Sequence, residues 1–230
     1  MNYSQRYEKK FFINFLEENR IKNKFDEIFK LEFEQGYYCC SIYFDDLDLS
    51  TLKQKQEGIT ERFKIRLRAY FFDLKDKPKF WNLEIKSKNN NTVRKKKITF
   101  SHSVILENLQ KKNYLFFSNK FHETAKTYFR PISITFYFRE AFISKILPHC
   151  RMTFDKNIRS FQYDLKYLDS LANNNNLIVN PKLILLELKY TNFLPTFISN
   201  YFKFLNLEQV TFSKYVDGFK IYKNNYLNKN

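Results

Sequence analysis

Residues 61–88 read ERFKIRLRAYFFDLKDKPKFWNLEIKSK, two alternating polar and apolar runs joined by the polar, proline-containing turn DKPK. In a β-strand, residues i and i+2 point to the same face. Arg66 and Arg68 therefore share one face of a strand over 61–74. Glu84 and Lys86 share one face of a second strand over 79–88. The short turn between the runs predicts an antiparallel hairpin whose strands each have one charged and one apolar face.

The same spacing recurs in three other segments, as Glu8/Lys10, Tyr137/Arg139 and Glu187/Lys189. One charged strand face is ordinary solvent exposure. Five such faces, each with at least one cation, indicate a surface or lumen that holds an anionic ligand. Two unit charges about 6 Å apart repel by roughly 3 kcal/mol at an effective dielectric constant of about 20, so a lumen of this kind must be wet and must serve a ligand.

The remaining patterns predict an α+β fold with a mostly antiparallel sheet. Continuous alternation with a charged face on nearly every strand favours closure into an antiparallel β-barrel with flanking helices over a sandwich, whose inward face would be apolar. We expect further strands over 3–14, 36–46, 92–100, 130–144, 150–162 and 183–191, and helices over 18–31, 103–112, 119–129 and 194–207.

Composition narrows the class of ligand. The 230 residues suit one medium to large domain or two small ones, and 43% apolar residues exclude a disordered polycation. The formal charge of +16 indicates a polyanionic partner such as nucleic acid, a phosphorylated ligand or an anionic membrane. Part of the lysine content can reflect an A+T-rich genome, so the positions of the arginines weigh more. With only 3 Gly, both glycine-rich phosphate-loop motifs are absent, and phosphate recognition would have to use side chains.

Targeting signals and metal-binding cysteine patterns are absent from the sequence. Cys39, Cys40 and Cys150 lack metal-ligand spacing and are interpreted as buried thiols of a reducing compartment. No apolar run reaches the roughly 18 residues of a membrane span, and the first ten residues lack the apolar core of a signal peptide. We expect a cytoplasmic protein without a transmembrane segment.

Seven strings occur in the order and character of the VTC domain, from about Tyr7 to about Tyr215: YEKKFFI, SIYFDDLDLSTLKQKQEGITERFKIRLRAY, LEIKSKNNNTVRKKK, RPISITFYFREAFIS, RMTFDKNIRSF, LLELKYTNFLP and FSKY. The chain thus resembles the polyphosphate polymerase domain of the triphosphate tunnel metalloenzyme, or CYTH-like, superfamily. The resemblance implies one domain over 1–230, with a core of about 5–217. It also implies an antiparallel tunnel of about eight strands, lined by Lys and Arg.

The resemblance also assigns roles to individual residues. Glu187 matches the carboxylate associated with a divalent metal, Mn²⁺ or Mg²⁺. The residues implied to act on the phosphates in catalysis are Arg66, Arg68, Lys86, Arg139, Arg151 and Lys214, and those implied to bind substrate are Lys10, Lys95, Tyr137, Lys189 and Ser213. The match of Lys95 is looser, because three consecutive lysines leave its register open.

One departure from the superfamily pattern bears on the activity. Hydrolytic relatives carry E-x-E-x-K near the N-terminus, where this chain has Arg6-Tyr7-Glu8-Lys9-Lys10. A cation in place of the first carboxylate favours making or holding polyphosphate over cleaving triphosphate. The resemblance therefore implies a polymerase that transfers the γ-phosphoryl of ATP to inorganic polyphosphate. The alternatives are a metal-dependent triphosphatase, acting on inorganic or nucleoside triphosphate, and a non-catalytic polyphosphate-binding module.

The expected partners are ATP and inorganic polyphosphate. Nucleic acid is not expected, because the aromatic residues mostly alternate away from the basic faces, whereas stacking on bases would need them there. The sequence leaves open a membrane-protein partner and does not determine the oligomeric state.

Overall fold

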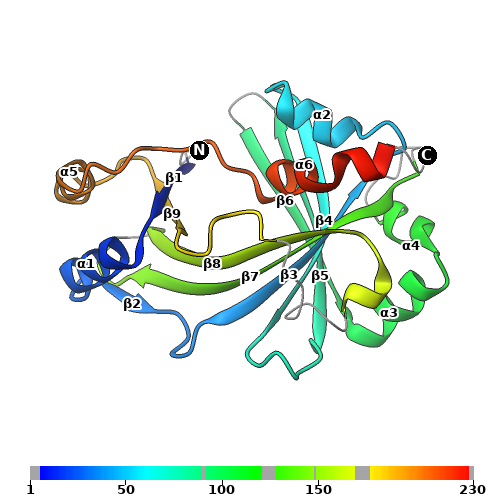
Figure 1. The fold of residues 1–230 in the computed structure, drawn as a ribbon, viewed down its shortest axis with the longest axis horizontal. Helices are drawn as coiled ribbons and strands as arrows, with labels where there is room; N and C mark the ends of the chain where they lie inside the picture. The colour runs from blue at the N-terminus through cyan, green and yellow to red at the C-terminus, as the bar shows by residue number, and fades with distance from the viewer. Residues whose placement is uncertain (1–5, 90–91, 121–127, 148, 169–176, 228–230) are drawn as a thin grey trace. The chain divides into compact units, whose positions relative to one another are not determined.

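The computed structural model describes residues 6–89, 92–120, 128–147, 149–168 and 177–227 (Figure 1). Within these residues the predicted α+β class is confirmed: nine strands belong to one antiparallel sheet, and six α-helices accompany it. The hydrogen-bonded strand order is β1-β9-β8-β7-β3-β4-β5-β6, and β2 pairs with β7. Closure of this sheet into a barrel stays a prediction. No described helix is long and apolar enough to cross a membrane.

The boundaries follow the predicted alternation closely. The strands are β1 (Arg6–Ile13), β2 (Phe29–Leu31), β3 (Tyr37–Asp45), β4 (Arg62–Phe71), β5 (Phe80–Asn89), β6 (Thr92–Ser101), β7 (Arg130–Ser144), β8 (Arg151–Gln162) and β9 (Ile184–Thr191). The helices are α1 (Phe15–Phe25), α2 (Ser50–Gln56), α3 (His102–Gln110), α4 (Tyr114–Ser118), α5 (Thr196–Phe204) and α6 (Lys214–Leu227), with a 3₁₀ turn at Leu165–Leu168.

The chain forms two compact units. Unit 1 comprises Met1–Tyr37, Tyr137–Ile158 and Val179–Phe212, and unit 2 comprises Tyr38–Phe136, Arg159–Ile178 and Ser213–Asn230. Strands β7 and β8 contribute residues to both units, and each unit has its own apolar core. The expectation that residues 1–230 form one domain stays a prediction.

The core of unit 1 lies on one face of β1, β9 and β8. Alternate residues of these strands, together with apolar residues of α1 and α5, fill it: Phe11, Ile13, Ile21, Phe25, Met152, Phe154, Ile184, Leu186, Leu188, Ile198 and Phe202. The residues between them, including Lys10 and Glu187, must point to the opposite face because side chains alternate along a strand. Packing thereby determines which side of this sheet is polar.

Helix α1 begins and ends earlier than predicted. Asn14 caps it: the Asn14 side chain accepts from the Glu17 amide, and the Glu17 side chain accepts from the Asn14 amide. This reciprocal capping box starts the helix at Phe15 rather than at residue 18. The helix stops at Phe25, because the short strand β2, which the sequence pattern missed, pairs with β7.

In unit 2, the strands β3, β4, β5 and β6 bury alternate residues such as Ile42, Ile65, Leu67 and Leu83 in one cluster with α3 and α4. The intervening residues of these strands form a polar face. In register, Arg68 of β4 lies opposite Ser41 of β3, and Arg66 lies opposite Glu84 of β5.

Three helices of unit 2, α2, α4 and α6, were missed from the sequence. Helix α2 follows the acidic turn after β3, where Asp45 accepts hydrogen bonds from the amides of Thr51 and Leu52. Helix α6 is the last described element of the chain, and its residues Tyr215 and Phe219 pack beside Tyr43. The helix predicted over 119–129 falls mostly on residues 121–127, which lie outside the described residues, while α4 covers Tyr114–Ser118.

Gly36, just before β3, provides a stability test. Its φ is +66°, and a Cβ there would lie 2.6 Å from Phe138 Cζ and 2.8 Å from the Arg139 carbonyl oxygen. Gly58 has a similar φ of +73°, with no atom within 4 Å of the corresponding position. Gly58→Ala should therefore cost only the left-handed backbone, about 1–2 kcal/mol. Gly36→Ala should cost about 1–3 kcal/mol more, because the added methyl is overpacked.

Urea denaturation of both variants measures this difference in the free energy of unfolding. Equal losses for the two alanine variants would contradict the close approach of Gly36 to β7.

Candidate functional site

The polar face of unit 1 places several of the sequence-predicted residues together. Lys10 of β1 lies directly opposite Glu187 of β9, and their Nζ and Oε1 atoms are 3.9 Å apart. Lys189 Nζ donates to Glu187 Oε2 at 3.0 Å. Arg139 Nη2 of β7 lies 3.6 Å from the same oxygen. Glu187 is thus a nearly buried carboxylate with three cations around it.

Arg139 has a closer partner than Glu187. Its Nε and Nη2 donate to the two carboxylate oxygens of Asp155 on β8, at 2.6 and 2.7 Å. Arg139 is 5% exposed and Asp155 is 0% exposed. The Tyr137 ring lies against the same guanidinium, 5.2 Å from its Cζ to the ring centroid. Tyr137 is fully buried, so this ring contact lies inside the protein.

Arg151, implied by the resemblance to act on phosphate, has other partners in unit 1. Its Nη2 donates to Glu32 and, at 2.9 Å, to the Tyr37 hydroxyl. Arg151 lies opposite Lys189 in the β8–β9 register. Because its side chain keeps about a third of its surface exposed, Arg151 retains access to solvent or ligand.

The polar face of unit 2 carries the second group of predicted residues. Arg66 donates from Nε to Glu84 Oε2 at 2.8 Å, and Lys95 Nζ lies 2.7 Å from Glu84 Oε1. Arg68 donates from Nε to the Ser41 hydroxyl at 3.0 Å. The contact with Glu84 gives Lys95 a defined place, which its run of lysines had left open.

Lys86 lies in a row of like charges. In the β4–β5–β6 register it is directly opposite Lys64 on one side and Lys95 on the other. Like charges directly opposite on one face are destabilising. This row would gain free energy from an anion laid across it.

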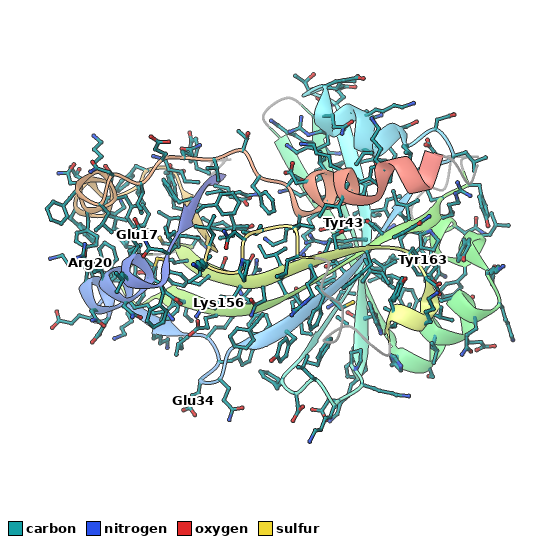
Figure 2. All side chains as sticks on the ribbon, in the orientation of Figure 1. Glu17, Arg20, Glu34, Tyr43, Lys156 and Tyr163 are labelled. Atoms are coloured by element: carbon teal, nitrogen blue, oxygen red, sulfur yellow. The ribbon has the colours of Figure 1, made fainter. Side chains whose placement is uncertain are left out.

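The surroundings of Tyr43 and Glu84 shift their acidities. Burial raises the pKa of Glu84, but Arg66, Lys95 and Arg68 together lower it more, to about 2. Burial also raises the pKa of Tyr43, which is labelled in Figure 2, and Lys64, Arg66 and Arg68 outweigh it and lower it to about 7. Both shifts show that this face favours negative charge.

Ser213 and Lys214 lie at the start of α6 in unit 2. The Ser213 hydroxyl accepts from the Val216 amide at 3.5 Å, and the Ser213 amide donates to Asp217 at 2.8 Å. Ser213 therefore caps the helix, and Lys214 occupies its first turn with 9% of its surface exposed. The positive end of the helix dipole adds to the charge of Lys214.

Sequence reasoning missed several residues of these faces. Asp155 and Thr153 follow Arg151 at spacings of four and two, and Ser133 and Thr135 precede Tyr137 in the same way. Extending the i, i+2 rule along β7 and β8 would have found all four. The hydroxyls of Thr153, Ser133 and Thr135 are buried and have no hydrogen-bond partner among the described residues, so each can bind a water or a ligand oxygen.

The donors for a metal ion are few. Within the described part of the chain, no three His, Cys, Asp or Glu side chains are grouped to hold one. Glu187 supplies one carboxylate, and the unpartnered Thr153 hydroxyl belongs to the residue opposite it in register. Mg²⁺ typically binds through one or two carboxylates together with substrate phosphates. This donor set fits a divalent ion that arrives with a phosphate ligand, rather than a metal held by protein groups alone.

Comparison with known families now identifies the architecture. The VTC domain profile matches residues 5–223. The chain belongs to the VTC domain family. No curated protein sequence matches it. The VTC assignment confirms the resemblance drawn from the seven strings.

Solved structures share the fold at low identity. A protein from Pyrococcus horikoshii OT3 is 12% identical, with a TM-score of 0.51 over 92% of this chain and 96% of its own. HpAC1 from Hippeastrum, a candidate adenylyl cyclase described as having a dominant triphosphatase activity, is 10% identical, with a TM-score of 0.50 over 90% of this chain and 92% of its own. At these identities the likeness concerns the fold alone.

The acid dependence of stability tests the ion pairs of Glu84. A folded-state pKa of about 2, below the ordinary 4.5, stabilises the protein fully above about pH 4.5. That stabilisation is lost as the pH falls toward 2. Its size is on the order of 3 kcal/mol. The free energy of unfolding of the parent should therefore exceed that of Glu84→Gln most at pH 7, and the difference should shrink between pH 4.5 and 2.

Urea denaturation across this pH range measures the difference. Glu107→Gln is the matched control, since Glu107 pairs with Lys111 in the same unit but is solvent-exposed. A Glu84→Gln difference that does not change with pH would contradict the depressed pKa.

Proposed function

We propose that this chain is a metal-dependent polyphosphate polymerase that transfers the γ-phosphoryl of ATP to the end of an inorganic polyphosphate chain. The observation that carries the proposal is the pairing of basic residues with buried carboxylates on the polar sheet face of each unit. Arg139 with Asp155, and Arg66 with Glu84, lie at or beside positions of the VTC strings. The family resemblance implies a tunnel lined by Lys and Arg.

The chemistry requires little covalent work from the protein. Phosphoryl transfer depends mainly on positioning and on neutralising charge on the phosphoryl oxygens. Arginine suits this role, because its fork matches phosphate geometry and stays charged in any environment. The incoming nucleophile is a terminal phosphate oxygen of the chain, already ionised. No general base is therefore needed, in keeping with the absence of a histidine-based constellation in the sequence.

Glu187 is the residue that would hold the divalent ion. When bound, Mn²⁺ or Mg²⁺ neutralises charge that develops on the phosphate oxygens. Lys10, Arg139 and Lys189 lie within 4 Å of the Glu187 oxygens, so the same residues would contact phosphate groups bound to that ion. The choice of metal, and the expected cytoplasmic location, belong to this proposal.

Triphosphate hydrolysis is the second candidate function. It is favoured by the retained Glu8, whose Oε1 lies 3.4 Å from Lys10 Nζ. Lys10 is thus flanked by Glu8 and Glu187, which leaves two carboxylates near one cation. The Arg6 side chain, which replaces the first carboxylate of the hydrolase pattern, lies outside the described residues.

The product formed from ATP tests the proposal directly. The purified chain with ATP and Mn²⁺ should give a ladder of long polyphosphate on a polyacrylamide gel. Glu187→Ala should lose the ladder but keep or tighten binding of inorganic tripolyphosphate, because it removes a negative charge beside three cations. Orthophosphate as the main product would support the triphosphatase instead. Tight polyphosphate binding without turnover would support a binding module.

Replacement of an arginine by lysine tests the forked geometry. Arg66→Lys keeps the charge but loses a bidentate donor, and hydrogen bonds to charged groups are worth about 1.5–3 kcal/mol. Polymer formation should fall by about 10–100-fold. The matched control is Arg20→Lys, at an exposed position on α1 (Figure 2). Equal rates for the two variants would show that Arg66 acts only as a point charge.

A further inference from the structure

Asp155 is the most deeply buried acidic group that contacts a predicted phosphate-binding arginine. Its side chain is 0% exposed, and both of its carboxylate oxygens accept from Arg139, one from Nε and one from Nη2. The second carboxylate near Arg139, that of Glu187, is farther away at 3.6 Å. Neither the family resemblance nor the spacing of charged residues in the sequence assigned Asp155 a role.

The geometry of the Arg139–Asp155 pair determines which edge of the guanidinium group would bind a phosphate. A guanidinium group has two edges able to bind an oxyanion in a forked manner, the Nε/Nη2 edge and the Nη1/Nη2 edge. Asp155 occupies the first edge. Ionic contact between Arg139 and a phosphate would therefore use the second edge, with the guanidinium plane fixed by Asp155 and by the Tyr137 ring beneath it.

Stability alone gives a weak reason for this pair. Buried salt bridges carry a desolvation penalty that can exceed their attraction, and apolar residues of similar volume often serve stability as well. An anion site also has no electrostatic use for a buried negative charge. An orientation role explains both features, because a fixed arginine loses less side-chain entropy when phosphate binds.

We propose that Asp155 is a positioning residue that holds Arg139 by its Nε/Nη2 edge and aims the other edge at a phosphate group of the substrate. The proposal deepens the proposed function and rests on it only in taking phosphate as the ligand. It predicts a change in phosphate affinity opposite to the change expected from charge alone. Removing a negative charge near an anion site should tighten binding, whereas releasing Arg139 should weaken it.

Isothermal titration calorimetry with inorganic tripolyphosphate shows whether substitution of Asp155 weakens or tightens binding. Asp155→Asn should bind tripolyphosphate about tenfold more weakly than the parent, although it has one negative charge fewer. Asp155→Glu keeps the charge and moves the carboxylate by one methylene, so it should also weaken binding. This second variant keeps the test open if Asp155→Asn does not fold. Unchanged or tighter binding by a folded variant of either kind would overturn the proposal.

A double-mutant cycle separates positioning from a general structural effect. In an Arg139→Lys background, Asp155→Asn should change the tripolyphosphate affinity by less than twofold, because Asp155 acts through the arginine fork. A full, additive loss in that background would overturn the proposal. Glu140→Gln is the matched control: Glu140 is also on β7 but pairs with Lys22 and Lys156, and the substitution should leave the affinity unchanged.

The binding readout also separates this inference from the proposed function. A parent protein that binds tripolyphosphate but makes no polymer would refute the polymerase and leave the role of Asp155 to be decided by the cycle. A parent that makes polymer, with affinity insensitive to Asp155, would refute only the positioning role.

Discussion

On both polar faces, the sheet buries arginine side chains away from water. Each buried charge needs a carboxylate or hydroxyl partner, and this need governs which residues lie beside it. Alternation along the strands sends one set of side chains into an apolar core and therefore forces the other set to one side. Arg139 and Arg68 are almost fully buried there. A buried charge is tolerated only when it is paired or hydrogen-bonded. Asp155 supplies that pairing for Arg139, and the Ser41 hydroxyl bonds Arg68.

The compensation is incomplete, and this incompleteness is what makes the faces suitable for an anion. Glu187 is one carboxylate among Lys10, Arg139 and Lys189, and Glu84 is one among Arg66, Arg68 and Lys95. The pKa of Tyr43, lowered to about 7, reports the same excess of positive charge. Phosphate oxygens would neutralise this excess without rearranging the sheet. Preorganised cations of this kind lower the reorganisation cost of phosphoryl transfer.

The strands were predictable because their signal is local. Strand β7 was expected over 130–144 and has those bounds, since its apolar and polar residues alternate from Ile132 to Arg139. The start of α1 was missed because the capping box of Asn14 and Glu17 was not considered. Helix α2 was missed because its seven residues, STLKQKQ, have no apolar periodicity, and the carboxylate that binds its amides, Asp45, lies outside it on β3.

The sequence by itself determined which residues share a strand face, because a period of two is a property of the strand backbone. It therefore identified Lys10, Arg66, Arg68, Arg139 and Glu187 as members of polar faces, and the family resemblance gave them a phosphate ligand. Only the tertiary structure decided which carboxylate holds which arginine. Asp155 is 16 residues from Arg139 and Glu84 is 18 from Arg66, and the registers of neighbouring strands bring them together. Register depends on core packing and turn geometry, which no single strand encodes.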